Sequence, residues 1–425
     1  MQRCDAETPA KQTLKQWDRS FMKAHQPANR ASDTTKPRSL NWPIVFFLIG
    51  IPVGAILSLL WVPVYKETIL MMPAWMVFRT LAITGGYHRL WSHRAYTASS
   101  PLKLFLAIIG AGAGQGSIIF WCRGHRAHHR YVDTDDDPYS IKKGFFHAHI
   151  GWMLYENEGI PYGVPINRQV DISDLKSDPI VRWQHRNYVI LFLLVGYIAP
   201  SLVCGLHHGD YLGGFLYTGC LAVALAQQGT FCVNSVAHWV GDQPYASEKS
   251  PRQSHLAGLL MLGEGYHNFH HEFPIDYRNG PQWYDLDMTK WMIWTLSQFG
   301  LASKLRRFPR NEIEKGRIQR KWEVLSTEGE TVDWGVPLEK LPIMEWEEFQ
   351  QQARTGCNFI VIKGVVHDVS AFVTEHPGGT ALITGAIGKD ATDMFEGGVY
   401  PHSGAAVNLL DTMRVAAIAP TTKSI

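Results

Sequence analysis

The chain has 425 residues, of which 46% are hydrophobic, 12% are aromatic and 18% are charged, and its formal net charge is +2. The charged fraction lies below the usual quarter, and the length is more than one domain usually needs. A net charge this close to zero argues against a role that depends on a strongly basic or acidic surface, so no nucleic acid is expected as a partner. Six cysteines without a CxxC pair argue against a disulfide framework.

Four apolar stretches are long enough to cross a bilayer, which takes about 20 helical residues. They cover residues 44–64, 69–87, 188–206 and 211–233. The links within each pair, YKET and HHGD, are so short that each pair is predicted as a helical hairpin. Most of the basic residues near the stretches flank the hairpins, at Lys36, Arg38, Arg89, Arg94, Arg182 and Arg186. This bias places both termini on the cytosolic side.

A fifth apolar stretch, residues 102–120, could also span by length, but it contains Lys103, Gln115 and several glycines. If it spanned, the motifs HRLWSH and HRAHH would fall on opposite faces of the membrane. We therefore expect a helix at the cytosolic interface or buried against the hairpins.

Histidine recurs in tight groups beside the apolar stretches. In HRAHH and HNFHH the i, i+3 and i+4 spacings place three imidazoles on one face of a helical turn. The two histidines of HRLWSH are five residues apart, so one is expected at a helix end. NSVAH adds an amide and a histidine at i, i+4, on one helical face. These motifs supply Asn234 and nine histidines: His88, His93, His125, His128, His129, His238, His267, His270 and His271.

Nine imidazoles exceed what one tetrahedral zinc ion needs, so the pattern predicts a site for more than one metal. Imidazole suits iron, copper, nickel and zinc, so spacing alone leaves the metal open. Four aspartates follow HRAHH closely, either to orient the imidazoles or to form a solvated acidic turn: Asp133, Asp135, Asp136 and Asp137. The other histidines, including His255, are isolated from this pattern.

Beyond residue 305 a basic run and a polar stretch, residues 306–340, are predicted as a flexible linker. Residues 341–418 then form a second domain, with an alternating strand pattern in FIVIKGVVHDVS. In HPGG the proline and glycines let the backbone turn beside His376. His402 can complete a bis-histidine haem site, which has no open position and therefore suits electron transfer. His367 lies in a strand pattern and is interpreted as structural.

Residues 43–305 resemble the membrane acyl-CoA desaturases through HRLWSH, HRAHH, NSVAHWVGDQPY and GEGYHNFHHEFPIDYRNG. Residues 341–418 resemble cytochrome b5, and the fusion is similar to the fungal delta-9 acyl-CoA desaturases. The resemblance implies a mainly α fold: four transmembrane helices with a cytosolic helical cap, then a small α+β cytochrome b5-like domain. The domains are then 1–42, a polar cytosolic segment; 43–305, the desaturase; 306–340, the linker; and 341–418, the haem domain.

The resemblance also implies the cofactors and the substrate contacts. The nine histidines would bind two irons, Asn234 would contact one metal through water, and His376 and His402 would hold a haem b. Three residues match positions at the bend of a substrate tunnel, although ordinary helix packing would also explain them: Gln115, Trp121 and Thr230. Arg123 and the basic residues near Arg182 and Arg186 are candidate contacts for the CoA head group. Gly124, where animal members carry an acidic residue, departs from the family pattern at the contact beside Arg123. No side chain beyond the metal ligands is expected to be catalytic.

The implied activity is the O2-dependent insertion of a cis double bond at carbon nine of stearoyl-CoA or palmitoyl-CoA, giving oleoyl-CoA or palmitoleoyl-CoA. Electrons would pass from NADH-cytochrome b5 reductase through the fused haem domain. The expected location is the endoplasmic reticulum membrane, in contact with membrane lipid, with the metal site on the cytosolic side. The alternatives are a hydroxylase or complex-lipid desaturase, a membrane-anchored electron carrier, and a transporter or metal-storage protein. Arg79 is the only charged residue well inside a predicted span, which argues against a transport path.

Overall fold

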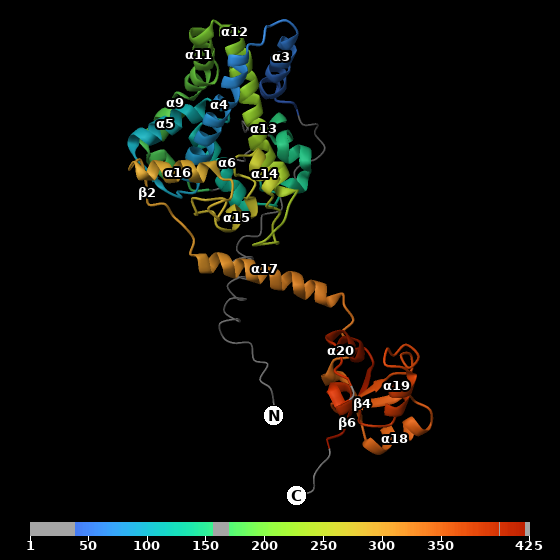
Figure 1. Ribbon diagram of the computed structural model, residues 1–425. Coiled ribbons are helices and arrows are strands. Elements are labelled where there is room, and N and C mark those ends of the chain that lie inside the picture. Colours follow the sequence, from blue (N-terminus) through green and yellow to red (C-terminus); the bar gives the residue numbers. More distant parts are fainter. Residues whose placement is uncertain (1–38, 156–169, 399, 421–425) are drawn as a thin grey trace. The chain divides into compact units, whose positions relative to one another are not determined.

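The computed structural model describes residues 39–155, 170–398 and 400–420 (Figure 1). The predicted N-terminal segment, 1–42, lies almost wholly outside these residues. The chain divides into two compact units, residues 1–320 and 321–425, and the division falls within a helix. Each unit is described by itself below.

Four helical segments of the first unit are long and apolar enough to cross a membrane, and they correspond to the four predicted stretches. Their helices lie side by side in Figure 1, where α3 (Ile51–Leu57), α4 (Lys66–Ala82), α11 (Ala199–His208) and α13 (Ala222–Ser235) are labelled. Each segment contains a π-helical stretch, in which the hydrogen-bond ladder is locally widened. The segments run over Trp42–Leu60, Lys66–Ser92, Tyr188–His208 and Tyr211–His238. Their remaining α-helical parts are α2 (Trp42–Val45), α10 (Tyr188–Leu193) and α12 (Tyr211–Gly213).

Arg79, within the second of these segments, is fully buried, with 0% of its surface exposed. Its Nη2 donates to the backbone carbonyls of Gly196 at 2.8 Å and of Thr218 at 3.4 Å. Both carbonyls belong to π-helical stretches of the other hairpin, Leu194–Ile198 and Gly214–Leu221. The side chain therefore ties the first hairpin to the second.

The fifth apolar stretch does not span, as predicted, but it is not one helix. It forms α5 (Ser100–Ala111) and the start of α6 (Ile118–Tyr131), separated by a turn at residues 112–117. Leu102 and Leu106 of α5 pack in the same buried cluster as Tyr87 of the second segment. The stretch is therefore buried against the first hairpin, one of the two placements that the sequence left open.

Short helices and one small sheet complete the first unit. The strands pair antiparallel, with Thr97 opposite Ser303. The bounds are α7 (Trp152–Leu154), α8 (Ser173–Ser177), α9 (Pro179–Arg186), α14 (His255–Leu260), α15 (His267–Glu272), α16 (Met288–Gln298), β1 (Thr97–Ala98) and β2 (Ala302–Ser303).

The region predicted as a flexible linker contains a long helix, α17 (Arg310–Glu330). Ile313, in its first turns, is buried against Phe269 and Phe273 of the first unit. Most of the other side chains of α17 are exposed or half-buried. The segment was predicted as flexible because it is polar. It is polar because it forms a helix that buries little of its surface.

The second unit is a four-stranded sheet with helices, which confirms the predicted small α+β domain. The strand order is β3-β6-β5-β4, with β3 parallel to β6 and the other pairs antiparallel. The predicted strands in FIVIKGVVHDVS form the β4–β5 hairpin, whose turn residues Lys363 and Gly364 both have positive φ, as a tight hairpin turn requires. The bounds are β3 (Ile343–Met344), α18 (Trp346–Arg354), β4 (Phe359–Ile362), β5 (Val365–Asp368), α19 (Thr380–Ala386), α20 (Gly404–Asp411) and β6 (Arg414–Ile418).

Candidate metal centre, acyl cavity and haem site

The nine predicted histidines come together in two groups, within each of which the ring nitrogens lie within 4.8 Å of one another. The first group has five members, His88, His93, His125, His129 and His270. The second group has four members, His128, His238, His267 and His271. Each group draws on residues that are far apart in the sequence, so the fold builds the site and no single motif does.

The two groups divide the histidine triplets in the same way. On α6, His125 and His129 belong to the first group and His128 to the second; on α15, His267 and His271 belong to the second and His270 to the first. In both helices the i, i+4 pair therefore shares a group, and the i+3 residue joins the other. One helical face thus serves two adjacent centres.

The five-residue spacing of HRLWSH is explained by a π-helical segment, Ile83–Ser92. His88 lies inside it, and His93 follows its last residue. One of the two histidines was predicted at a helix end, and His93 lies there. A π-helix is closed by hydrogen bonds between residues i and i+5, and the N–H of His93 donates to the carbonyl of His88 at 3.1 Å. The two rings accordingly lie 4.9 Å apart between centroids.

The distances between ring nitrogens fit bound metal ions. Within the groups, five Nε2–Nε2 distances fall at 2.8–3.1 Å. At a metal–nitrogen bond of about 2.1 Å, neighbouring ligands of an octahedral ion lie about 3.0 Å apart, against about 3.4 Å for a tetrahedral ion. Nε2 of His270 approaches two other Nε2 atoms at 3.0 Å, and one ring nitrogen carries at most one proton. A shared metal explains this convergence better than hydrogen bonds do.

Burial keeps these imidazoles in the neutral form that binds metals. Loss of solvent lowers the pKa of His93, His125, His129, His270 and His271 well below the ordinary value, and neighbouring histidines lower it further. It lowers the pKa of His267 to about 3. Because metal binding requires deprotonated ligands, no proton has to be displaced from these rings near pH 7.

Acceptors behind the rings hold three of the histidines in the tautomer that points Nε2 at the centre. Nδ1 of His128 lies 2.9 Å from Asp137, and Nδ1 of His88 lies 3.1 Å from Glu264. Nδ1 of His238 lies 2.7 Å from the hydroxyl of Ser250, which donates in turn to Asp133. Such partners fix ring orientation and raise ligand basicity.

Both predicted roles of the acidic turn after HRAHH therefore occur: one aspartate orients an imidazole, and another is exposed to solvent. Asp137 is buried against a histidine, whereas Asp135 is exposed. Neither Glu264 nor Ser250 was predicted as a site residue, although Glu264 lies three residues before His267 in the GEGYHN segment.

Replacing Asp137 by asparagine is expected to lower the metal affinity of the second group about 10- to 100-fold, because the ring of His128 loses its anionic partner. Competition with a chelator, followed by metal analysis, measures the change. The matched control is Asp135→Asn, on the exposed side of the same turn, which should bind metal as the unchanged chain does. Equal metal retention by the two variants would contradict this role of Asp137.

The NSVAH prediction is wrong in one respect. Asn234 and His238 were expected on one helical face, but α13 ends at Ser235 and a 3-10 turn covers Val236–His238. His238 belongs to the second histidine group, and Asn234 lines the cavity described below. The i, i+4 rule fails here because the helix does not continue.

The position of Arg89 beside the first hairpin suggested a charge at the membrane interface, but the structure buries this residue. It is 1% exposed, and its guanidinium donates to Asp287 at 2.9 and 3.0 Å and to Glu264 at 2.8 Å. Asp287 also accepts from the backbone N–H groups of Asn279, Gly280 and Lys290. This buried network joins the carboxylate behind His88 to the start of α16.

Replacing Asp287 by alanine is expected to lower the free energy of unfolding by about 3–5 kcal/mol, because Arg89 then keeps only Glu264 as an anionic partner. Thermal unfolding in detergent micelles, followed by fluorescence, checks this. Glu312→Ala, which removes an exposed pair with Lys315, is the control and should leave the unfolding temperature unchanged. An unchanged unfolding temperature for Asp287→Ala would rule out a stabilising role for the network.

A largely apolar cavity of about 770 Å³ opens onto the histidine groups. Four of the nine clustered histidines line it: His88, His125, His128 and His267. Apolar residues also line it, among them Ile44, Phe47, Leu48, Met76 and Phe192. A long apolar chain in this cavity would pass directly beside the histidines.

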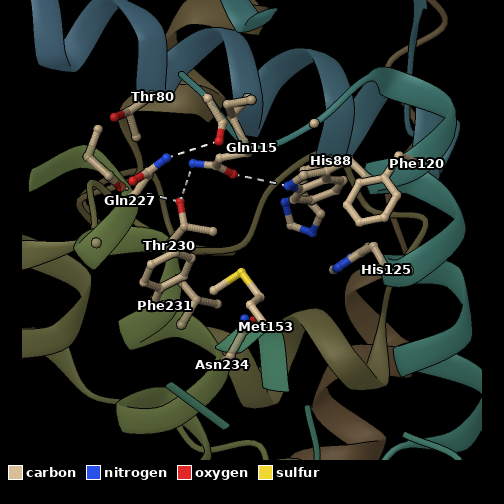
Figure 2. Close-up of a pocket in the computed structure, with 18 of the residues that line it drawn as sticks. Thr80, His88, Gln115, Phe120, His125, Met153, Gln227, Thr230, Phe231 and Asn234 are labelled. Carbon is tan, nitrogen blue, oxygen red and sulfur yellow. Dashed lines mark hydrogen bonds between the residues drawn. The ribbon is translucent and has the colours of Figure 1, made fainter. Parts of the chain in front are cut away.

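The three predicted bend residues line the wall of this cavity and are linked by hydrogen bonds. Figure 2 shows Gln115 and Thr230 on this wall. The amide of Gln115 donates to the hydroxyl of Thr230 at 2.8 Å, and the indole N–H of Trp121 donates to the carbonyl oxygen of Gln115 at 3.1 Å. Trp121 also stacks on His125, with ring centroids 4.9 Å apart. Arg123, predicted as a head-group contact, is not among the residues that line the cavity, whereas the exposed Arg186 is.

In the second unit, the rings of His376 and His402 lie 6.3 Å apart between centroids. An iron bound by both Nε2 atoms at about 2 Å places the centroids about 6 Å apart. Nδ1 of His376 lies 3.3 Å from the carbonyl of Gly379, and Nδ1 of His402 lies 2.8 Å from that of Phe395. Each Nδ1–H is thus held by a backbone oxygen, which leaves Nε2 free to bind metal.

Apolar side chains lie beside this pair, as a haem ring requires. One buried cluster includes Val369, Ile383 and Leu410, with Phe372 and Phe395 packed against it. His367 lies elsewhere: it is 3% exposed within β5, which agrees with its interpretation as structural.

Comparison with known proteins relates both units to established families. Residues 67–303 match the fatty acid desaturase family, and residues 345–419 match the cytochrome b5-like heme/steroid binding domain. A probable acyl-CoA desaturase of Schizosaccharomyces pombe is 48% identical over 381 residues, which cover 90% of this chain and 78% of that protein. Acyl-CoA desaturase 1 of Saccharomyces cerevisiae is 42% identical, covering 89% and 74%.

Animal relatives match over a smaller share of the chain. Stearoyl-CoA desaturase 5 of Bos taurus is 37% identical over 279 residues, which cover 65% of this chain and 83% of that protein. The match to the desaturase family spans more than half of the chain and contains all nine clustered histidines. The chain therefore belongs to the fatty acid desaturase family and carries a cytochrome b5-like domain at its C-terminal end.

Proposed function

We propose that this protein is an acyl-CoA delta-9 desaturase. It inserts a cis double bond between carbons nine and ten of stearoyl-CoA or palmitoyl-CoA and gives oleoyl-CoA or palmitoleoyl-CoA. The observation that carries the proposal is the apolar cavity that leads directly to two groups of converging histidines. Its volume lies within the range of about 300–1,000 Å³ that is usual for small-molecule sites.

Two iron ions fit the histidine groups, and their ligands would be the five imidazoles of the first group and the four of the second. Asn234 faces the same cavity and would contact one metal through water. Bound iron supplies the oxidation of an unactivated methylene by O2, for which no side chain is a strong enough oxidant. The reaction consumes O2, two electrons and two protons, and forms one double bond and two water molecules.

The side chains of the protein hold the acyl chain in place beside the metals. The apolar wall excludes water from the acyl chain, and the bonded set Gln115, Trp121 and Thr230 gives the wall a fixed shape beside the histidines. One pair of carbons is thereby held at the metals while the rest of the chain continues along the cavity. Arg186, at the exposed part of the wall, offers a cation to the phosphates of CoA.

The second unit would hold a haem b between His376 and His402. A haem with two histidine ligands has no open position and carries single electrons. It would receive them from NADH-cytochrome b5 reductase and pass them to the first unit. Covalent fusion keeps the donor on the same chain as the metal centre and so raises its local concentration. The proposed location is the endoplasmic reticulum membrane, with both termini and the metal site in the cytosol.

The test is a product assay. Membranes that contain the protein receive stearoyl-CoA, NADH and cytochrome b5 reductase in air, and mass spectrometry locates any double bond. A cis bond at carbon nine is the expected product. A hydroxylated product would assign the chain to the hydroxylases instead. Complete absence of product from protein loaded with iron and haem would mean that acyl-CoA is not the substrate, and complex lipids would be tried next.

A further inference from the structure

The turn between α5 and α6 forms part of the cavity wall. Residues 112–117 are not helical, and four of them line the cavity: Gly114, Gln115, Gly116 and Ser117. The turn packs between two membrane-spanning segments, because a Cβ added at Gly114 would lie 2.9 Å from Phe192 of one and 3.0 Å from Gln227 of the other. Irregular backbone at such a place is stable only if its polar groups find partners in the protein.

Side chains from these two segments and from α9 supply the partners. The N–H of Gly116 donates to the hydroxyl of Tyr188 at 2.8 Å, and the N–H of Ile118 donates to Gln184 at 3.1 Å. The carbonyl of Gly114 accepts from Nε2 of Gln227 at 2.9 Å. Gln227 itself is 3% exposed, so water does not replace this bond readily.

Gln227 and Thr230 hold the same part of the turn from one face of α13, since they are three residues apart. Gln227 binds the carbonyl just before Gln115, and Thr230 accepts from the side chain of Gln115. Figure 2 shows the two glutamine amides side by side on the cavity wall, with Thr230 next to them and His88 beyond. From Gln115 the contacts continue through Trp121 to His125. An unbroken series of contacts thus joins α13 to the first histidine group.

We infer that Gln227 is a positioning residue that sets which carbon pair of the acyl chain lies at the metals. It acts by fixing the backbone of the turn, and therefore the place of Gln115, relative to the histidines. This inference rests on the proposed function, because it concerns the position of the double bond. The wall must be fixed closely, since a displacement of about 1 Å at a reacting centre can change a rate about 100-fold.

The test compares the positions of the double bonds formed by Gln227→Leu and by the unchanged protein. Leucine has a similar size but donates no hydrogen bond, so the carbonyl of Gly114 loses its partner. The fraction of product with its double bond away from the main position should rise about tenfold or more. The matched control is Gln228→Leu, the same change one residue further along, where the amide contacts His149 away from the turn. This control should keep the original position.

Each outcome has a distinct meaning. A Gln227→Leu enzyme that is slower but keeps a single bond position would overturn the inference and leave Gln227 a merely structural residue. If leucine prevents accumulation, Gln227→Met fills the same space with a more adaptable side chain and should show the same mixed positions; failure of both variants to accumulate would likewise make Gln227 a folding residue. Absence of any unsaturated product from the unchanged protein would instead refute the proposed function.

Discussion

Replacement of His128 by alanine is expected to abolish desaturation and to remove one of two non-haem irons per chain. His128 is 2% exposed, its Nδ1 is held by Asp137, and its Nε2 has no hydrogen-bond partner among the residues that the structure describes. Buried polar atoms normally have a hydrogen-bond partner, so a buried ring nitrogen that is oriented but unpaired is well suited to bind a metal ion. Because loss of an outer partner alone costs about 10- to 100-fold in metal affinity or activity, loss of the ligand should lower turnover by about 100-fold or more.

Iron analysis of the purified protein and the product assay together measure this effect. His255→Ala is the matched control, because His255 is exposed and belongs to neither histidine group. The control should retain both irons and its activity. A His128→Ala variant with two non-haem irons and normal turnover would show that the second group does not bind a catalytic metal.

Replacement of His376 by alanine is expected to remove the haem and to stop the transfer of electrons from NADH, while both non-haem irons remain. The physical reason is that one imidazole cannot supply both axial ligands of a six-coordinate haem. NADH-driven desaturation should fall at least about tenfold, because the donor that fusion keeps at a raised local concentration can no longer carry electrons. Loss of the haem absorbance and the rate of product formation are the two measurements.

Addition of separate cytochrome b5 at high concentration should restore activity to the His376→Ala enzyme, which shows that its first unit is intact. His402→Ala should behave in the same way, since it removes the opposite ligand. Full NADH-driven activity in a His376→Ala protein without haem would contradict the proposed electron path.

The sequence was sufficient to predict the histidines because ligands on one helical turn recur at fixed spacings. It could not predict how they divide between two groups, since the division depends on how the fold brings α6 and α15 together with His88, His93 and His238. The π-helical segment that aligns His88 with His93 was equally hidden, because π-helices have no simple sequence signature. Only the structure shows that one face of each triplet serves two centres.

Charged residues were the hardest to interpret from sequence. Arg89 was taken as a topology signal because it follows an apolar stretch, yet the fold buries it against Glu264 and Asp287. These carboxylates lie more than 170 residues along the chain, as their pair separations of 175 and 198 show. Gln227 was overlooked for a related reason: a glutamine in an apolar stretch has no visible partner until the turn at Gly114 is in place.

The most direct test of the proposed site is the iron and haem content of the full-length protein. Metal analysis combined with haem absorbance should give two non-haem irons and one haem per chain, in keeping with five and four converging histidines and one facing pair. One non-haem iron, or none, in protein that carries its haem would contradict a two-iron centre and, with it, the proposed chemistry.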